Sequence, residues 1–155
     1  MTEKIVPAHG SSVARIDIPA DCKWRVSDIY IVETAWKEAC EELKAKLPVL
    51  SEFKGLLGDA KVMAAALMMQ DELAQMVEKI YAYARLQQDA DNTDQHMQAL
   101  SGEAEALAAE FSNTNSFIEP EILALDKEKL AEMLATEPAL ANYKYYIENL
   151  VRLAD

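Results

Sequence analysis

The chain contains 155 residues, of which 51% are hydrophobic and 27% are charged, values that are ordinary for a soluble globular protein with one hydrophobic core. The formal net charge of −12 argues against a nucleic-acid partner and against an anionic membrane surface, because both kinds of binding need concentrated Lys and Arg. We therefore expect an acidic surface that serves solubility.

The two cysteines, Cys22 and Cys40, are too few for a disulfide framework and lack the paired spacing of a zinc knuckle. Residues 1–6 are not the apolar stretch of a signal peptide. The longest apolar run, at residues 62–69, is too short to span a bilayer. These features predict a protein of a reducing compartment, the cytoplasm.

Strong helix formers dominate the composition, and only four Gly and five Pro occur, so the expected fold class is all-α. Residues 1–22 form the exception, because the alternation at 15–18 leads into Pro19, which opposes helix. These residues are predicted to be an extended N-terminal arm. The competing interpretation is a partly disordered terminus.

A first long helix is predicted from Glu33 towards Phe53, and Pro48 is expected to kink or end it. Its apolar side chains recur at helical spacing. They are Trp36, Cys40, Leu43, Leu47 and Leu50. A second helix is predicted from Asp59, as its cap, to about residue 88, and a break near Gln70 remains open.

After a polar loop at 89–92, a third helix is predicted, capped by Thr93 and ending near Asn113. The remaining chain predicts a short helical turn and two further helices. Their expected positions are 120–125 for the turn, 126–134 for the next helix and 136 onward for the last. Residues 23–155 should therefore form an elongated helical bundle of about five or six helices.

No constellation of catalytic or metal-binding residues stands out. His9 and His96 are far apart and have no Cys or carboxylate at ligand spacing. The chain contains no His-Glu-x-x-His string, and no nucleophile with a neighbouring base is recognisable. We expect no catalytic residue, no metal site and no cofactor within this chain.

Four residues are candidates for a surface that contacts a peptide or a partner lobe. They are Tyr145, Tyr146, Met68 and Met69. Tyr offers rigid area with a polar tip, and Met adapts to varied partners. Core packing is the competing interpretation. Residues 62–69 are apolar on nearly every side of a helix, so they are expected either to pack against something outside this chain or to be buried at its centre.

Six short segments, in order, resemble the amino-terminal part of the oligoendopeptidase F family, whose members are zinc metallopeptidases that cut short peptides inside cells. They are WRVSDIY at 24–30, FKGLL at 53–57, DEL at 71–73, YAYA at 81–84, DADNTD at 89–94 and SFIEPEIL at 116–123. Within them, the positions expected to be structural signatures are Trp24, Asp28, Tyr30, Gly55, Tyr83, Asp91, Phe117 and Pro120. The resemblance also implies that the N-terminal arm lies along the body of the enzyme and that Trp24 anchors it.

The resemblance implies that residues 23–155 are a non-catalytic helical lobe, which helps to enclose the peptide channel of a longer enzyme. It implies zinc for the full-length parent, oligopeptides as its substrates, and the catalytic lobe of the same polypeptide as the partner. Alone, the chain should be inactive. The alternative is a free-standing acidic helical bundle that acts as an interaction or scaffold module. An excised lobe should bare an apolar patch or hide it in a homodimer, whereas a free-standing module should not.

Overall fold

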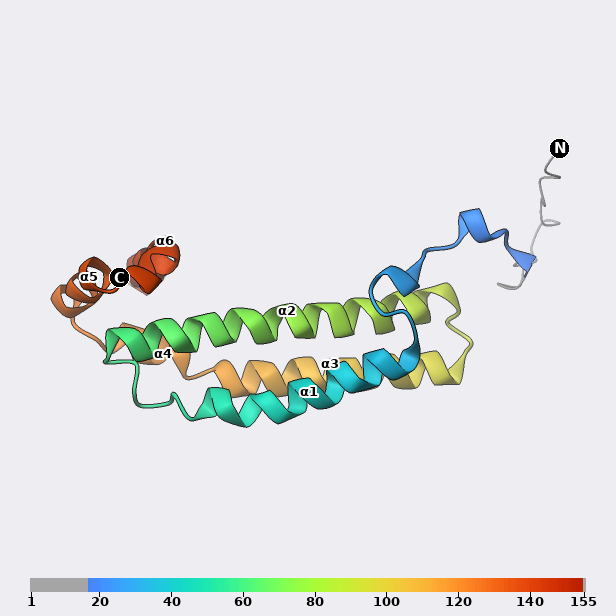
Figure 1. The fold of residues 1–155 in the computed structure, drawn as a ribbon, viewed down its shortest axis with the longest axis horizontal. Coiled ribbons are helices and arrows are strands. Elements are labelled where there is room, and N and C mark those ends of the chain that lie inside the picture. The colour runs from blue at the N-terminus through green and yellow to red at the C-terminus, as the bar shows by residue number, and fades with distance from the viewer. Residues whose placement is uncertain (1–16, 155) are drawn as a thin grey trace.

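The computed structural model describes residues 17–154, which contain helices and no β-strand. The elements are η2 (Ala20–Cys22), η3 (Val26–Asp28), α1 (Glu33–Ser51), α2 (Ala60–Ala90), α3 (Gln95–Asn115), α4 (Ile118–Leu123), α5 (Lys127–Thr136), η4 (Pro138–Tyr143) and α6 (Lys144–Ala154), where η marks a 3-10 helix. Figure 1 shows α1, α2 and α3 running side by side, with α5 and α6 gathered at one end of α2. The predicted elongated all-α bundle is confirmed.

Most of the expected N-terminal arm, residues 1–16, lies outside the described residues. The described part is not fully extended, because the chain makes a 3-10 turn at Ala20–Cys22 and another at Val26–Asp28. Trp24, the expected anchor, is 59% exposed, whereas Val26 is buried against the bundle. Burial of Val26 therefore fixes this segment to the body.

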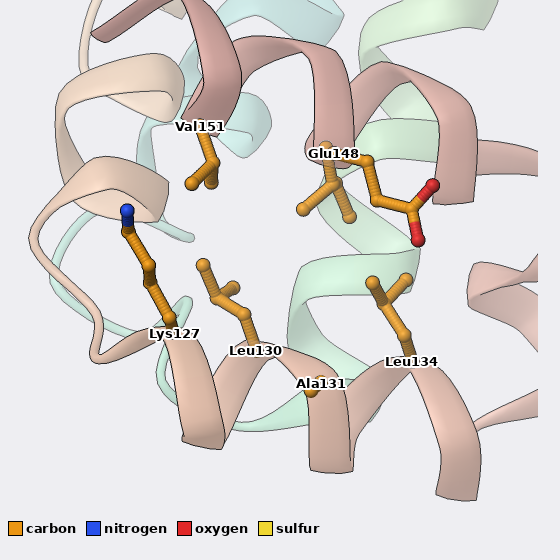
Figure 2. Close-up of a pocket in the computed structure, with 7 residues that line it drawn as sticks. Lys127, Leu130, Ala131, Leu134, Glu148 and Val151 are labelled. Carbon is orange, nitrogen blue, oxygen red and sulfur yellow. The ribbon is translucent and has the colours of Figure 1, made fainter. Parts of the chain in front are cut away.

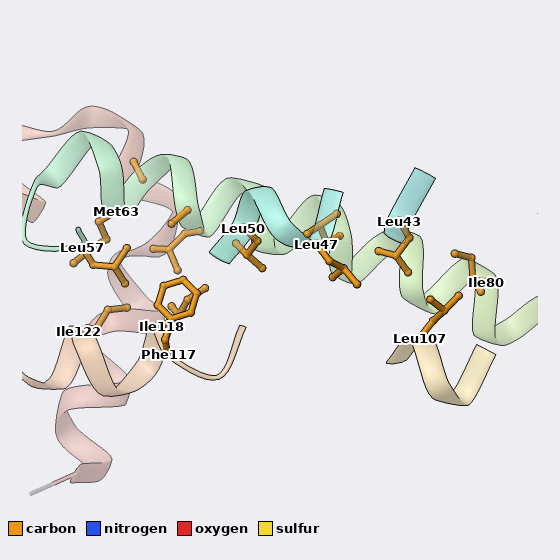
Figure 3. Close-up of a cluster of buried hydrophobic side chains, with 14 of the residues drawn as sticks. Leu43, Leu47, Leu50, Leu57, Met63, Ile80, Leu107, Phe117, Ile118 and Ile122 are labelled. Atoms are coloured by element: carbon orange, nitrogen blue, oxygen red, sulfur yellow. The ribbon is translucent and has the colours of Figure 1, made fainter. Parts of the chain in front are cut away.

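The α1 stripe is buried as predicted, and it forms the centre of the core with α2 and α3 (Figure 3). Trp36 is fully buried, and its indole Nε1 donates a hydrogen bond to the Ile80 carbonyl oxygen on α2 at 3.0 Å. A buried indole N–H normally needs such a partner. Full burial of each large apolar side chain contributes about 1.5–3 kcal/mol, so the α1 stripe stabilises the packing of α1 against α2 and α3.

The second helix is a single unbroken element of 31 residues, about 46 Å long at 1.5 Å per residue. Asp59 caps it as predicted, since its carboxylate accepts hydrogen bonds from the Lys61 and Val62 amides at 2.9 and 3.1 Å. The break considered near Gln70 does not occur. No Gly or Pro lies within the helix, and α2 packs against α1 and α3 as well as against η4 and α5.

The end of α1 agrees with the expectation for Pro48, since the helix ends at Ser51, within one turn of the proline. The following turn contains Gly55 with φ +82°, a left-handed conformation that favours glycine. The Gly55 amide donates to the Glu121 carboxylate at 2.7 Å. This hydrogen bond ties the α1–α2 connection to α4.

The predicted cap of the third helix is wrong. Asp94, not Thr93, occupies the cap position, and its carboxylate accepts from the His96 and Met97 amides at 2.8 and 3.4 Å. The Thr93 hydroxyl instead donates to the Asp91 carboxylate at 2.7 Å. Asp91 thus organises the loop, and the next acidic residue begins the helix.

The C-terminal helices differ in detail from the predicted ones. The turn expected at 120–125 is α4, which begins at Ile118 and holds Pro120 in its first turn, where a missing N–H costs nothing. The last helix begins with the 3-10 segment η4, capped by the Glu137 carboxylate, which accepts from the Ala139 amide at 3.0 Å. An α-helix continues from Lys144.

We call residues 127–154 (α5, η4 and α6) the C-terminal unit. Leu140 and Ile147 are fully buried where this unit meets the bundle. Two tyrosine hydroxyls also fasten it: Tyr143 donates to the Asp71 carboxylate at 2.7 Å, and Tyr146 donates to Glu119 at 3.2 Å. The unit therefore covers the first half of α2 from the side opposite α1 and α3.

Candidate functional site

A groove with a mainly apolar lining lies between α5 and α6 of the C-terminal unit, and we call it the α5–α6 groove. It measures about 200 Å³. Its lining residues are Lys127, Leu130, Ala131, Leu134, Ile147, Glu148 and Val151. Figure 2 shows Leu130 of α5 pointing towards Val151 of α6, and Leu134 of α5 pointing towards Glu148. The groove therefore has an apolar floor, and charged side chains lie at its rim.

Two shallower depressions continue this groove, because both share Glu148 with it. One runs along α5 past Ala135 to Lys144. The other lies on the outer face of α6, where Tyr145, 80% exposed, adjoins Arg152. All three depressions are therefore joined through Glu148, two between the helices and one on α6 alone.

The four residues predicted to form a contact surface occupy different environments. Met68 is 57% exposed on α2, whereas Met69 packs against the core. Tyr145 is on the outer face of α6, and Tyr146 is half-buried with its hydroxyl bonded to Glu119. The exposed members of the set, Met68 and Tyr145, are the ones that could meet a partner.

Central burial accounts for most of the apolar run at 62–69. Met63, Ala64, Ala66 and Leu67 are all buried. They lie in the part of α2 that is enclosed by α1 and α3 on one side and by the C-terminal unit on another. The chain's own helices therefore cover this run, and Met68 is its one large exposed side chain.

The two fastening tyrosines are held in their neutral form. Burial and the neighbouring Asp71 carboxylate raise the pKa of Tyr143 to about 12. Burial and Glu119 raise the pKa of Tyr146 to about 12. A neutral phenol donates to a carboxylate, whereas a phenolate would repel it. Both residues therefore hold the C-terminal unit in place and do not act as acids near neutral pH.

Three aromatic rings join the start of the described chain to the core. The Tyr30 and Tyr83 rings meet edge-on with centroids 5.5 Å apart, and Tyr83 stacks on Trp36 at 6.2 Å. Burial, with Cys40 and Glu42 nearby, raises the pKa of the Tyr30 phenol. This cluster packs the N-terminal segment onto α1 and α2.

The other signature positions also have structural roles. Phe117 is buried ahead of α4, and Gly55 makes the left-handed turn described above. Asp91 organises the α2–α3 loop, and Asp28 forms an exposed ion pair with Arg25 at 3.2 Å. None of these contacts assembles reacting groups.

A metal centre does not fit the described residues. Between residues 17 and 154, no group of three or more His, Cys, Asp and Glu side chains is placed to hold an ion. His96 instead meets the Glu33 carboxylate at 2.7 Å, which also binds Lys37 at 2.7 Å. Hydrogen bonds from Lys37 and His96 lower the pKa of Glu33. His9 lies outside the described residues.

Sequence reasoning missed the residues of the α5–α6 groove. A signal was present, because Leu130, Leu134 and Val151 occupy apolar positions on two short neighbouring helices. The spacing of apolar residues in each helix was compatible with full burial, and only the packing of α5 against α6 shows that Leu134 and Val151 remain partly exposed.

Within residues 17–154, none of the helices has the length and hydropathy of a membrane span.

Comparison with known proteins finds similarity to oligopeptidases of the F type. A family model described as Oligopeptidase F matches residues 121–155. The chain is 29% identical over 139 residues to oligopeptidase PepF of Bacillus subtilis, covering 89% of this chain and 21% of that protein. It is 31% identical to the chromosomal oligoendopeptidase F of Lactococcus lactis subsp. cremoris, covering 88% of this chain and 23% of that protein.

Solved structures give the same result. A crystal structure of oligoendopeptidase F from Enterococcus faecium matches with a TM-score of 0.72 and 30% identity, over 77% of this chain and 23% of that one. A second crystal structure, from Chlamydophila abortus, matches with a TM-score of 0.80 and 25% identity, over 90% of this chain and 24% of that one. The chain thus spans less than a quarter of the length of these proteins. Over most of its length the chain is therefore similar to proteins of the oligoendopeptidase F family, and the matches are consistent with the amino-terminal lobe of such a protein.

Proposed function

We propose that the chain is the non-catalytic lobe of a cytoplasmic zinc peptidase that hydrolyses short peptides, and that it helps to enclose the channel in which they are cut. The observation that carries this proposal is the match of nearly the whole chain to about a fifth of oligopeptidase PepF. The chemistry then belongs to the other four fifths. The absence of a His-Glu-x-x-His string from this sequence agrees with that division.

The shape of the lobe suits a structural role, as one wall of the peptide channel, better than a catalytic role. Its three long helices form a stiff body with a continuous core, and α2 alone is about 46 Å long at 1.5 Å per residue. A rigid wall of that length can exclude folded proteins from a channel and admit extended peptides. Zinc would be bound by residues outside this chain, where it would supply an activated water.

The test compares three proteins: the chain alone, the chain joined to the part of Bacillus PepF that lies outside the match, and that part alone. We call the joined protein the chimera. We expect the chain alone to leave a quenched oligopeptide intact and the chimera to cleave it in a chelator-sensitive way. The chimera should also leave intact a folded protein that the part alone cleaves.

Two results would contradict the proposal. One is chelator-sensitive cleavage by the chain alone, which would make the lobe a catalyst. The other is equal cleavage of a folded protein with and without the lobe, which would leave the lobe no part in enclosing the channel. If the chimera does not cleave oligopeptides at all, a free-standing interaction module becomes the better account of this chain.

A further inference from the structure

The charge of the protein is distributed unevenly between the bundle and the C-terminal unit. The unit has four basic residues, Lys127, Lys129, Lys144 and Arg152, and four acidic residues, Glu128, Glu132, Glu137 and Glu148. Its charges therefore cancel, and the net charge of −12 resides in the rest of the chain. Another protein surface can approach the C-terminal unit without the general repulsion that the acidic bundle imposes.

The α5–α6 groove lies on this neutral unit and is suited to an inserted helix. Ala131 is exposed at its edge, and Leu134 and Val151 are only partly buried. A groove between two helices accepts the side-chain ridge of a third, which is a recurring way to bind an amphipathic helix. The charged side chains Lys127, Lys144 and Glu148 lie along its edges, and Lys144 forms an ion pair with Glu148 at 3.8 Å.

We propose that the α5–α6 groove is the seat of an amphipathic helix from the remainder of the same full-length polypeptide. This inference rests on the proposed function and names the surface through which the lobe meets its neighbour. More than three quarters of each compared relative lies outside the matched segment. An occupant within the same chain is therefore available in proteins of this family.

The area of the groove favours a tethered occupant over a second copy of the chain. Helices of 10 and 11 residues are each about 16 Å long. Two such helices side by side, each about 10 Å wide, offer about 300 Å² to a partner. A stable dimer buries about 1,200 Å² or more in total, so this face alone is too small. A tethered helix has a millimolar effective concentration, and a small interface then suffices.

The test measures the solvent accessibility of position 131. Ala131→Cys is made in a Cys22→Ser background, and its rate of reaction with a thiol reagent is followed by mass spectrometry of the peptide that contains it. Cys40 remains slow, because it is buried and its pKa is raised to about 11. Ala99→Cys is the matched control, since Ala99 is also an exposed helical alanine, on α3 and outside the C-terminal unit.

We expect position 131 to react at least about tenfold more slowly in the chimera than in the chain alone, a protection worth about 1.4 kcal/mol. Position 99 should react equally in both proteins. Equal rates at position 131, or the same slowing at both positions, would overturn the inference. Labelling at position 131 that slows as the concentration of the chain alone rises would assign the groove to a second copy, which also overturns it.

The two proposals can fail separately. Protection of position 131 in a chimera that does not cleave oligopeptides would support the docking site and reject the peptidase function. Cleavage by a chimera in which position 131 reacts freely would support the function and reject the docking site.

Discussion

Leu140→Ala should loosen the C-terminal unit without melting the bundle. Leu140 is fully buried in η4, where the unit meets α2. A buried Leu→Ala change costs about 3 kcal/mol, from the lost transfer of the side chain and from the cavity that remains. If the unit opens by itself, its hydrogen-exchange protection should fall by about 150-fold, since 1.36 kcal/mol corresponds to a factor of ten.

The assay is native-state hydrogen exchange, resolved by helix. In Leu140→Ala, the amides of α5 and α6 should lose this protection, and those in the centre of α1 and α2 should lose far less. Leu43→Ala is the matched control, because Leu43 is equally buried but lies in the α1 stripe. It should lower protection throughout α1, α2 and α3. A uniform loss in Leu140→Ala would show that the unit and the bundle unfold together, and the reasoning would be wrong.

Three further predictions concern single contacts. Gly55→Ala should lower Tm, because it forces a residue with a Cβ into a left-handed conformation at a cost of about 1–2 kcal/mol. Gly102→Ala, in a helix with open space around it, should raise Tm. Equal shifts in Tm for the two variants would contradict this prediction. Tyr143→Phe should cost about 0.5 kcal/mol at neutral pH, since the lost hydrogen bond is exposed. The raised native pKa of about 12 means that the neutral phenol stabilises the fold below pH 10 and loses this effect as pH rises towards 12, so the variant should show a shallower alkaline fall in Tm. Asp94→Ala should lower the free energy of unfolding, measured in urea, by about 1 kcal/mol, and Thr93→Ala should lower it clearly less. The reverse order would support Thr93 as the cap of α3.

The long helices could be predicted from the sequence because their signals are local. Every apolar residue of the α1 stripe is buried, and Asp59 caps α2 through the two amides that a cap should reach. Periodicity and capping depend on neighbours within a few residues, so they need no knowledge of the rest of the fold. The elongated bundle followed from these signals and from the short loops between them.

The errors arose where two local solutions were nearly equal. Thr93 and Asp94 are both good caps by residue type, and the choice fell to Asp94 because Asp91 engages the Thr93 hydroxyl. The continuity of α2 through Gln70 is a tertiary result, since helices on several sides hold that stretch in place. Propensity alone does not distinguish a break from a continuous helix there.

Sequence reasoning identified only part of the candidate contact surface. Residue type suggested Met68, Met69, Tyr145 and Tyr146, but exposure depends on which side of each helix its neighbours cover. The structure partly buries Met69 and Tyr146 against the core, and it leaves Met68 and Tyr145 exposed. The α5–α6 groove needed the packing of two helices whose individual patterns were unremarkable.

The signature segments and the groove report different properties of the same protein. Tyr30 and Tyr83 hold the N-terminal segment to the core, and Gly55 ties the first connection to α4 through Glu121. These contacts fix the internal geometry of this chain, and the segments that make them are the ones that carry the resemblance. The α5–α6 groove lies outside those segments. Its proposed role in docking depends on a surface that this chain does not contain. Internal ties can therefore identify such a lobe from its sequence, whereas the surface by which it meets its neighbour has to be found in the fold.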